Sequence, residues 1–274
     1  MHQIKMIGVD LDGTLLTTKK ELTSYTRQVL TEAIARGIVV LAATGRPYTG
    51  IPEEFRTFPG IRYALTSNGA RILDTLEQKV LIERLLPLES AKKALEILQK
   101  YDTLQEVYFD GQGYAEAGKL EQIERYHHNP HMWEYVRKSR KPVVSLSELV
   151  AGEKRDMDKV QGLFADMEER QQAWEELERC GDLQLVSSLG YNIEINAAGV
   201  NKGTGLVELG KLLGICREEI MAFGDGDNDI DMLREVGIGV AMGNAEEQVK
   251  EAADCITATN DEEGVAMAII KYMQ

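Results

Sequence analysis

The chain has 274 residues, enough for one large domain or two modest ones, and its 43% hydrophobic and 28% charged residues are ordinary for a soluble globular protein. Its formal net charge of −14 argues against nucleic acid or an anionic membrane as a partner, because both favour basic surfaces. Three widely spaced cysteines suit a reducing compartment, and no signal peptide or bilayer-spanning apolar run is visible, so we expect a cytoplasmic protein.

The first apolar run, from Ile7, leads into two aspartates, Asp10 and Asp12, followed by Gly13. An uncharged run of this kind predicts a strand buried on both faces. Side chains two residues apart on an extended backbone point the same way, so both carboxylates should lie close together at the end of the strand. Such a pair is costly unless a cation lies between the carboxylates or one takes up a proton. The alternative is an acidic turn closed by Gly13.

Two further strands are expected in this first part of the chain. A helix capped by Thr23 or Ser24 precedes the apolar run 38–43, which ends at Thr44-Gly45-Arg46-Pro47. A third run, 63–65, ends at Thr66-Ser67-Asn68-Gly69, and no comparable helix follows it. Strands alternating with helices predict a parallel sheet with covered faces.

The pattern changes over residues 84–195 and then resumes. Within this stretch, an amphipathic helix over 90–100 accompanies shorter, more alternating strands, which favours an α/β layer with one solvated face. After residue 196 another apolar run, 219–223, ends at Gly224-Asp225-Gly-Asp-Asn228-Asp229. We therefore predict an α/β fold: a Rossmann-like parallel sheet core with helices on both faces, formed by residues 1–83 and 196–274, and an α/β domain inserted at 84–195.

Polar residues follow four of these runs where each strand ends: Asp10 and Asp12, Thr44, Asn68, and Asp225. In open α/β sheets, ligands bind outside the carboxyl ends of the parallel strands. The coincidence of four such ends favours a functional site over a plain acidic turn. Carboxylates at this density suit Mg²⁺, which is commonly completed by a substrate phosphate.

Neighbouring residues complete a pocket for a phosphate dianion. Thr44, the backbone N–H of Gly45 and Lys202 can hold the anion, and Asn228 can add a neutral hydrogen bond. One carboxylate could then attack phosphorus and form an acyl phosphate, which water removes.

Other interpretations of these motifs fail because residues that they require are missing. The run from Asp225 opens like an EF-hand loop, but Ile230 stands where glycine is needed and Val236 where glutamate is needed. The Asn201-Lys202-Gly-Thr204 run resembles a guanine-reading loop, but Thr204 replaces the required aspartate and the chain has no Walker loop.

His127, His128 and His131 form a histidine cluster beside Pro130. It could be a zinc site, but no cysteine or carboxylate pattern joins it, so a solvated loop is favoured.

The motifs together resemble a known family. Asp10-Leu-Asp12-Gly-Thr-Leu, Thr44-Gly-Arg46-Pro, Lys202-Gly-Thr and Gly224-Asp225-x-x-Asn228-Asp229 are similar, in order and separation, to the four motifs of the haloacid-dehalogenase-like hydrolases. The insertion resembles the type IIB α/β cap of the Cof branch. The sequences around Asn68 and Lys202 resemble those of the YidA-like sugar phosphatases in that branch.

The resemblance implies a role for each motif residue. Asp10 would be the nucleophile and a Mg²⁺ ligand, and Asp12 would protonate the leaving alcohol, later activate water, and place its main-chain oxygen on the metal. Thr44, Gly45 and Lys202 would hold the phosphoryl group. Asp225 would bind the metal, Asn228 would contact phosphate or water, and Asp229 would support the metal or Lys202. Arg46 and Asn68 are the core candidates for contacting the rest of the substrate.

These residues lead to the expectation of a Mg²⁺-dependent phosphatase acting on a small phosphorylated metabolite, first of all a sugar phosphate, beneath a closing cap. One alternative is a phosphomutase or phosphotransferase using the same phosphoaspartate. Another is a catalytically idle, metabolite-binding regulator.

Overall fold

The computed structural model describes residues 3–273, which divide into two compact units. The first comprises the chain up to Arg46, Ile51–Glu83, and the chain from Asn201 onward; the second comprises Pro47–Gly50 and Arg84–Val200. This division differs from the expected boundaries in two places. The last strand of the second unit runs on to Ala197, and the short segment Pro47–Gly50 groups with the second unit.

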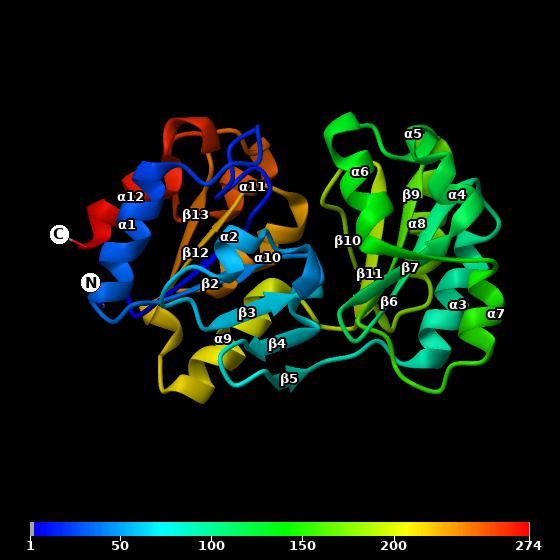
Figure 1. Ribbon diagram of the computed structural model, residues 1–274, viewed down its shortest axis with the longest axis horizontal. Coiled ribbons are helices and arrows are strands. Elements are labelled where there is room, and N and C mark those ends of the chain that lie inside the picture. Colours follow the sequence, from blue (N-terminus) through cyan, green and yellow to red (C-terminus); the bar gives the residue numbers. More distant parts are fainter. Residues whose placement is uncertain (1–2, 274) are drawn as a thin grey trace. The chain divides into compact units, whose positions relative to one another are not determined.

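The first unit is built on a sheet of eight strands among the described residues, in the order β14-β13-β12-β1-β2-β3-β4-β5 (Figure 1). The strands are β1 (Met6–Val9), β2 (Val39–Ala43), β3 (Tyr63–Thr66), β4 (Arg71–Asp74), β5 (Lys79–Glu83), β12 (Ile220–Gly224), β13 (Ile238–Ala241) and β14 (Cys255–Ile256). From β14 to β3 the neighbours are parallel, and β4 and β5 add an antiparallel edge. The direct return from β3 to β4 explains why no long helix follows Asn68.

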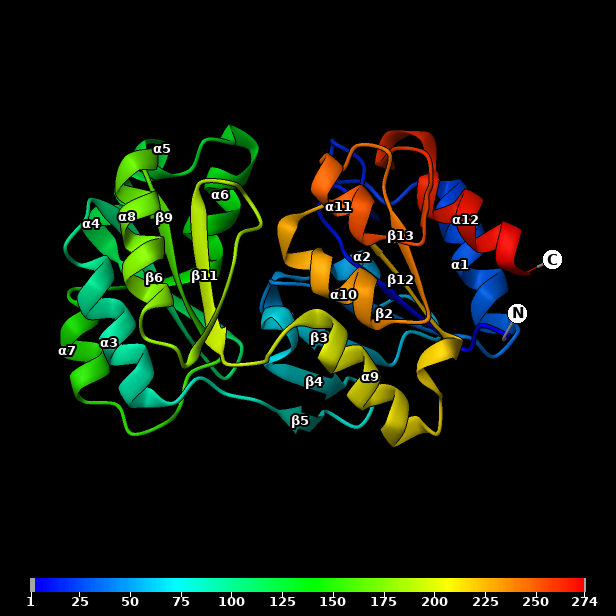
Figure 2. The same ribbon diagram turned by 180° about the vertical axis from the view of Figure 1, so that it is seen from behind.

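Helices cover both faces of this sheet, as the sequence predicts for a Rossmann-like core. Figures 1 and 2 show α1 and α12 on one face and α9, α10 and α11 on the other. The helices of the unit are α1 (Ser24–Ala35), α2 (Glu53–Arg56), α9 (Lys202–Leu213), α10 (Ile230–Glu235), α11 (Glu247–Ala252) and α12 (Gly264–Met273), with 3-10 turns η2 (Ser67–Gly69), η3 (Arg217–Glu219), η4 (Asp227–Asp229) and η5 (Asn260–Glu262). The expected cap is confirmed, because the Thr23 side chain accepts a hydrogen bond from Thr26 N.

Strand β1 lies between β2 and β12, and all four of its residues are buried. Its neighbours are parallel to it, so all three strands end at the same edge of the sheet. Because these strands are buried, charged and polar side chains follow the last strand residues, which is where Asp10, Thr44 and Asp225 occur.

The second unit holds a sheet of six strands among the described residues, in the order β10-β11-β9-β6-β7-β8. The strands are β6 (Thr103–Phe109), β7 (Gln112–Glu116), β8 (Arg140–Val143), β9 (Lys159–Phe164), β10 (Leu183–Val186) and β11 (Asn192–Ala197). Its helices are α3 (Leu88–Leu98), α4 (Ala117–Glu121), α5 (Ile123–Tyr126), α6 (Pro130–Ser139), α7 (Leu146–Ala151) and α8 (Met167–Glu178), together with the 3-10 turn η1 (Tyr48–Gly50). All neighbours are antiparallel except the parallel pair β7 and β8.

The two faces of this sheet differ in chemistry. Apolar side chains of β6, β9 and β11 form a core with α3, α7 and α8 on one face. The other face was expected to be solvated, and this expectation is wrong: Glu106, Lys159 and Glu194 lie on it and are buried. They are accommodated because Lys159 pairs with Glu194, and Glu106 with Arg140 at 3.0 Å.

None of the helices formed by residues 3–273 is both long and apolar enough to cross a membrane.

Candidate active site

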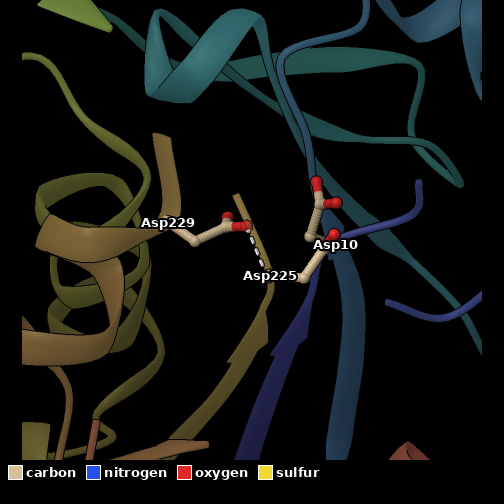
Figure 3. A group of neighbouring side chains, drawn as sticks. All are labelled: Asp10, Asp225 and Asp229. Atoms are coloured by element: carbon tan, nitrogen blue, oxygen red, sulfur yellow. Dashed lines mark hydrogen bonds between the residues drawn. The ribbon is translucent and has the colours of Figure 1, made fainter. Parts of the chain in front are cut away.

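Three carboxylates meet at the carboxyl ends of β1 and β12. Asp10 directly follows β1, and its N–H continues the strand ladder by donating to Phe223 O at 3.0 Å. Asp225 directly follows β12, and Asp229 ends the short turn η4. One carboxylate oxygen from each of the three aspartates lies within 4.8 Å of the others (Figure 3).

Lys202 supplies the positive charge of this group. It is the first residue of α9, where Asn201 caps the helix by accepting from Thr204 N at 2.8 Å. The Lys202 amine lies 2.8 Å from Asp10 Oδ1 and 2.7 Å from Asp229 Oδ1, with the side chain 0% exposed. The helix start therefore fixes the ammonium between two buried carboxylates.

Asp229 uses both carboxylate oxygens for positioning. Its Oδ1 accepts from Lys202, and its Oδ2 accepts from the N–H groups of Asp225 and Gly226, each at 3.0 Å. Figure 3 shows the hydrogen bond between Asp225 and Asp229 as a dashed line. The same carboxylate therefore holds the loop that carries Asp225 and the lysine that faces Asp10.

Burial makes two of these carboxylates difficult to ionise without a further cation. It is the largest influence on Asp10 and raises its pKa to about 8; Lys202 opposes the shift, and Asp229 and Asp225 add to it. Burial likewise raises the pKa of Asp225 to about 7, with Asp229 adding to the shift. For Lys202, burial works against the charged form, but Asp10 and Asp229 outweigh it and raise the pKa of the amine.

The donor set fits a small divalent cation. Three carboxylates and one ammonium leave two uncompensated negative charges when all are ionised, and all the oxygens are hard ligands. Space beside Asp225 is kept open by Gly13, where a Cβ would lie 2.2 Å from Asp225 Oδ2. Among the described residues, this is the one group of three or more His, Cys, Asp or Glu side chains arranged to hold a metal ion.

Asp12 lies beyond the end of the strand, so the alternation argument does not apply to its side chain. The strand ends at Val9 and the chain turns at once, with Leu15 N donating to Asp10 O at 3.2 Å. The Asp12 carboxylate instead accepts from Arg46 Nε and Nη2 and from Lys20 Nζ, each at 2.7 Å. Burial opposes ionisation of Asp12, but Arg46 and Lys20 outweigh it and lower its pKa.

The remaining expected site residues lie at neighbouring strand ends. Thr44 follows β2 and is 2% exposed; its Oγ1 accepts from Arg46 N at 3.1 Å, across Gly45. Asn68 donates its N–H to Thr44 O at 3.1 Å and accepts from Asn228 Nδ2 at 3.3 Å. The structure thus joins Asn68 to Asn228, whereas Arg46 is joined to Asp12.

Three residues of the site escaped the sequence analysis. Thr14 donates to Asp225 Oδ1 at 2.6 Å, and Asn244 donates to Gly13 O at 2.8 Å. Asn244 follows the end of β13, so the rule that found Asp225 could have found it as well. Lys20 lies in a loop with no motif, and only the folded structure reveals its contact with Asp12.

The histidine cluster has a different environment from the one expected. His127 is 2% exposed, and its Nδ1 lies 3.1 Å from the Tyr191 hydroxyl. His128 is stacked on the Tyr191 ring, with 4.1 Å between ring centroids, and α6 starts at Pro130. The expectation of a solvated loop is therefore wrong for His127.

Comparison with known proteins agrees with this architecture. The family model of haloacid dehalogenase-like hydrolases matches residues 7–269. The 5-amino-6-(5-phospho-D-ribitylamino)uracil phosphatase YcsE of Bacillus subtilis is 33% identical over 267 residues, 97% of this chain and 94% of that protein.

Solved structures of the same kind superpose over nearly the whole chain. A haloacid dehalogenase-like hydrolase from B. subtilis has a TM-score of 0.87 at 32% identity and covers 97% of this chain and 99% of its own. The subclass IIB sugar phosphatase BT4131 has a TM-score of 0.82 at 27% identity, covering 98% and 99%.

The chain has a parallel-sheet core, carboxylates at the strand ends and an inserted α/β unit. These features place it in a class of α/β hydrolases. The chain belongs to the haloacid dehalogenase-like hydrolase family, in the Cof-type, subclass IIB branch. It is a phosphoric monoester hydrolase.

Proposed function

We propose that this phosphatase is Mg²⁺-dependent and hydrolyses a small phosphorylated metabolite, first of all a sugar phosphate, through a phosphoaspartate on Asp10. The observation that carries the proposal is the buried group in which Asp10 and Asp225 lie within 4.8 Å of each other beside Lys202. Such a group has the charge and the oxygen ligands that a divalent cation and a phosphate dianion require together.

Asp10 is assigned the role of nucleophile. A carboxylate oxygen attacks phosphorus, an acyl phosphate forms on Asp10, and the bond from phosphorus to the leaving oxygen breaks. Lys202 favours the ionised form of Asp10, against the effect of burial, and, with Thr44, the N–H of Gly45 and Asn228, binds the phosphoryl oxygens. Asp10, Asp225 and the main-chain oxygen of Asp12 would hold Mg²⁺, which would supply further positive charge for those oxygens.

Asp12 is assigned the acid and base steps. It donates a proton to the leaving alcohol and then accepts one from the water that hydrolyses the acyl phosphate. Asp229 supports both Lys202 and the Asp225 loop, since both of its oxygens are engaged in those contacts. Arg46 and Asn68 are assigned to contacts with the part of the substrate beyond the phosphate.

The substrate class is supported by similarity. YcsE is named for a phosphoribityl compound, and BT4131 is a sugar phosphatase, so both names describe a phosphate carried by a sugar or sugar alcohol. The alkoxide of such a polyol is a poor leaving group, so its departure from phosphorus needs a proton donor such as Asp12.

The test is phosphate release from a panel of sugar phosphates, phosphoribityl compounds, nucleotides, and flavin and pyridoxal phosphates, with Mg²⁺ and with a chelator. We expect turnover that needs Mg²⁺, prefers sugar or sugar-alcohol phosphates, and falls by about 10³-fold or more in Asp10→Asn. Asp12→Asn should slow both halves of the reaction.

Three outcomes would decide against this proposal. Normal turnover in Asp10→Asn would remove the nucleophile assignment. Isomerised product without free phosphate would indicate a phosphomutase, and tight metabolite binding without any turnover would indicate an idle regulator.

A further inference from the structure

We propose that Asn244 is a positioning residue for the metal site, which holds the peptide between Gly13 and Thr14 so that the Asp225 carboxylate keeps one orientation for binding Mg²⁺. The inference rests on the proposed function, in which Asp225 binds Mg²⁺. Asn244 follows the end of β13 and lies outside the four motifs, and its side-chain Nδ2 lies 2.8 Å from Gly13 O.

The orientation of the Asn244 amide is fixed by two partners of opposite kinds. Its Oδ1 accepts from Asn260 N at 3.0 Å, and a backbone N–H can only donate. Its Nδ2 donates to Gly13 O at 2.8 Å, and a backbone carbonyl can only accept. An amide turned by half a rotation would place two oxygens together on one side and two donors together on the other. The hydrogen bonds therefore permit one orientation, in which Nδ2 faces Gly13.

The peptide that Asn244 holds is one that could otherwise rotate. Gly13 has a φ of +82°, and glycine adopts left-handed and right-handed conformations with similar ease. A rotation of this peptide would turn the Gly13 carbonyl away from Asn244 and displace Thr14. Water could satisfy the carbonyl in several orientations, whereas the fixed amide of Asn244 satisfies it in one. The side chain therefore selects a single conformation of a flexible turn.

The same turn determines how the Asp225 carboxylate lies. Thr14 Oγ1 donates to Asp225 Oδ1 at 2.6 Å. Gly13 packs against the other oxygen, since a Cβ on this glycine would lie 2.2 Å from Asp225 Oδ2. Asn244 Nδ2 is itself 3.5 Å from Asp225 Oδ2, at the limit of a hydrogen bond. By fixing the turn, Asn244 keeps the carboxylate oriented, and groups that orient a metal ligand raise the affinity for the metal.

A second amide holds the same loop at a different carbonyl and provides a matched comparison. Asn260 Nδ2 donates to Leu16 O at 2.9 Å, three residues beyond Gly13. The donor and acceptor are of the same kinds as in the bond from Asn244, and the distance is nearly the same. Leu16 O, however, does not belong to the peptide that contacts Asp225. Loss of this bond therefore reports how much general support of the loop contributes.

The experiment measures Mg²⁺ binding without substrate, from thermal unfolding of the full chain over a series of MgCl₂ concentrations. Asn244→Ala removes the amide, and we expect its dissociation constant for Mg²⁺ to rise by about 10- to 100-fold. Asn260→Ala keeps the backbone N–H that Asn244 accepts, so its constant should stay within about threefold of the wild type. In phosphate release, Asn244→Ala should need more Mg²⁺ but approach the wild-type kcat once Mg²⁺ is saturating.

A double-mutant cycle tests the route through Thr14. Thr14→Val removes the hydroxyl that donates to Asp225 and keeps the shape of the side chain. If Asn244 acts by placing Thr14, Asn244→Ala should weaken Mg²⁺ binding much less in the Thr14→Val protein than in the wild type.

Two further measurements separate positioning from folding. Without Mg²⁺, Asn244→Ala should unfold at nearly the wild-type urea concentration, because water can replace its hydrogen bonds at this exposed position. Asn244→Ser has a side chain one atom too short for the contact with Gly13 and should show the same weakened Mg²⁺ binding, so the test does not depend on a single variant.

The results distinguish this proposal from the proposed function. Wild-type Mg²⁺ affinity in Asn244→Ala, an equal loss in Asn260→Ala, or fully additive losses with Thr14→Val would overturn the role of Asn244 while the Mg²⁺-dependent phosphatase stands. A wild-type protein that does not respond to Mg²⁺ would remove both proposals. Mg²⁺ binding that depends on Asn244, without phosphate release from any ester, would support the positioning role and remove the proposed function alone.

Discussion

The Lys202 amine lies 2.8 Å from Asp10 Oδ1, although 192 positions separate the two residues along the chain. Both side chains are buried, and the lysine is the first residue of a helix whereas the aspartate follows a central strand. Because burying an isolated charge is expensive, each of the two groups makes the burial of the other possible. The pair therefore belongs to the stability of the fold as well as to the proposed site.

Replacing Lys202 by methionine should destabilise the protein by about 3 to 5 kcal/mol in the absence of divalent cations, because Asp10 and Asp229 lose their buried counter-charge. Urea unfolding monitored by circular dichroism measures this loss, and added Mg²⁺ should reduce it. Lys211→Met is the matched control, since Lys211 is exposed in the last turn of the same helix. Equal stability of the two variants would contradict the expected role of the buried amine.

Mg²⁺ should stabilise the folded protein against unfolding, and Asp225 should be needed for this effect. A ligand at about 100 times its dissociation constant adds about 2.7 kcal/mol to the free energy of unfolding. Thermal unfolding of the wild type should therefore move upward with Mg²⁺, whereas Asp225→Asn should respond little. Asp227→Asn, two residues away at an exposed position, should respond like the wild type. A full Mg²⁺ response in Asp225→Asn would show that the cation binds elsewhere.

Gly69→Ala should disturb the start of α9, which carries Lys202. Gly69 has a φ of +103°, and a Cβ there would lie 2.5 Å from the backbone oxygen of Asn201, the cap of that helix. Strain and overlap together should cost about 2 to 4 kcal/mol and lower activity. Gly214→Ala, at the other end of α9, also has a positive φ but meets nothing within 4 Å, so it reports the backbone strain alone. Equal losses of stability and activity would mean that the overlap with Asn201 is relieved at no cost.

His127 should make stability depend on pH in mildly acidic solution. Burial is the main cause that lowers its pKa to about 4, whereas an unfolded histidine titrates near 6.5. As pH falls from about 6.5 to about 4, the unfolded chain takes up a proton that the folded protein does not, so stability decreases. The contribution of this residue is about 2 to 3 kcal/mol over that range, and it changes little below pH 4.

His127→Asn tests this dependence, because asparagine offers an acceptor near the Nδ1 position and does not titrate. Its free energy of unfolding, measured in urea at several pH values, should fall less steeply between pH 6.5 and 4 than that of the wild type. His128→Asn, at an exposed position, should keep the wild-type slope. Parallel curves for all three proteins would assign the acid sensitivity to other groups.

The parallel core could be predicted from the sequence because the strand residues of each run are apolar and polar residues follow where each strand ends. Burial on both faces requires the first property, and the open edge of a parallel sheet explains the second. The same rule identified Asp10 and Asp225, and the carboxylates do meet there. It does not describe side chains beyond the strands, and so it could not predict the contacts of Asp12 with Arg46 and Lys20.

The second unit was less predictable for a related reason. Charged residues alternate with apolar residues in its strands, as at Glu106, Lys159 and Glu194. This is the pattern of a strand with one solvent-exposed face. Each finds a charged partner from another strand of the sheet, and a single-strand pattern contains no information about such pairs. Lys20 was missed in the same way, since its contact with Asp12 depends on the shape of a loop.

The position of β1 between β2 and β12 also has a consequence for biosynthesis. Met6 pairs with Val39 on one side and with Ile220 on the other, so one edge of β1 has no partner until the chain is more than 200 residues longer. At about 5 to 20 residues per second, a ribosome needs roughly 10 to 40 seconds to supply it. During that time the nascent chain exposes an unpaired strand edge ending in Asp10. Unpaired edges are prone to aggregation, so we expect chaperones to bind the chain at this stage. The residues proposed for catalysis are brought together last, when the final third of the chain closes the sheet.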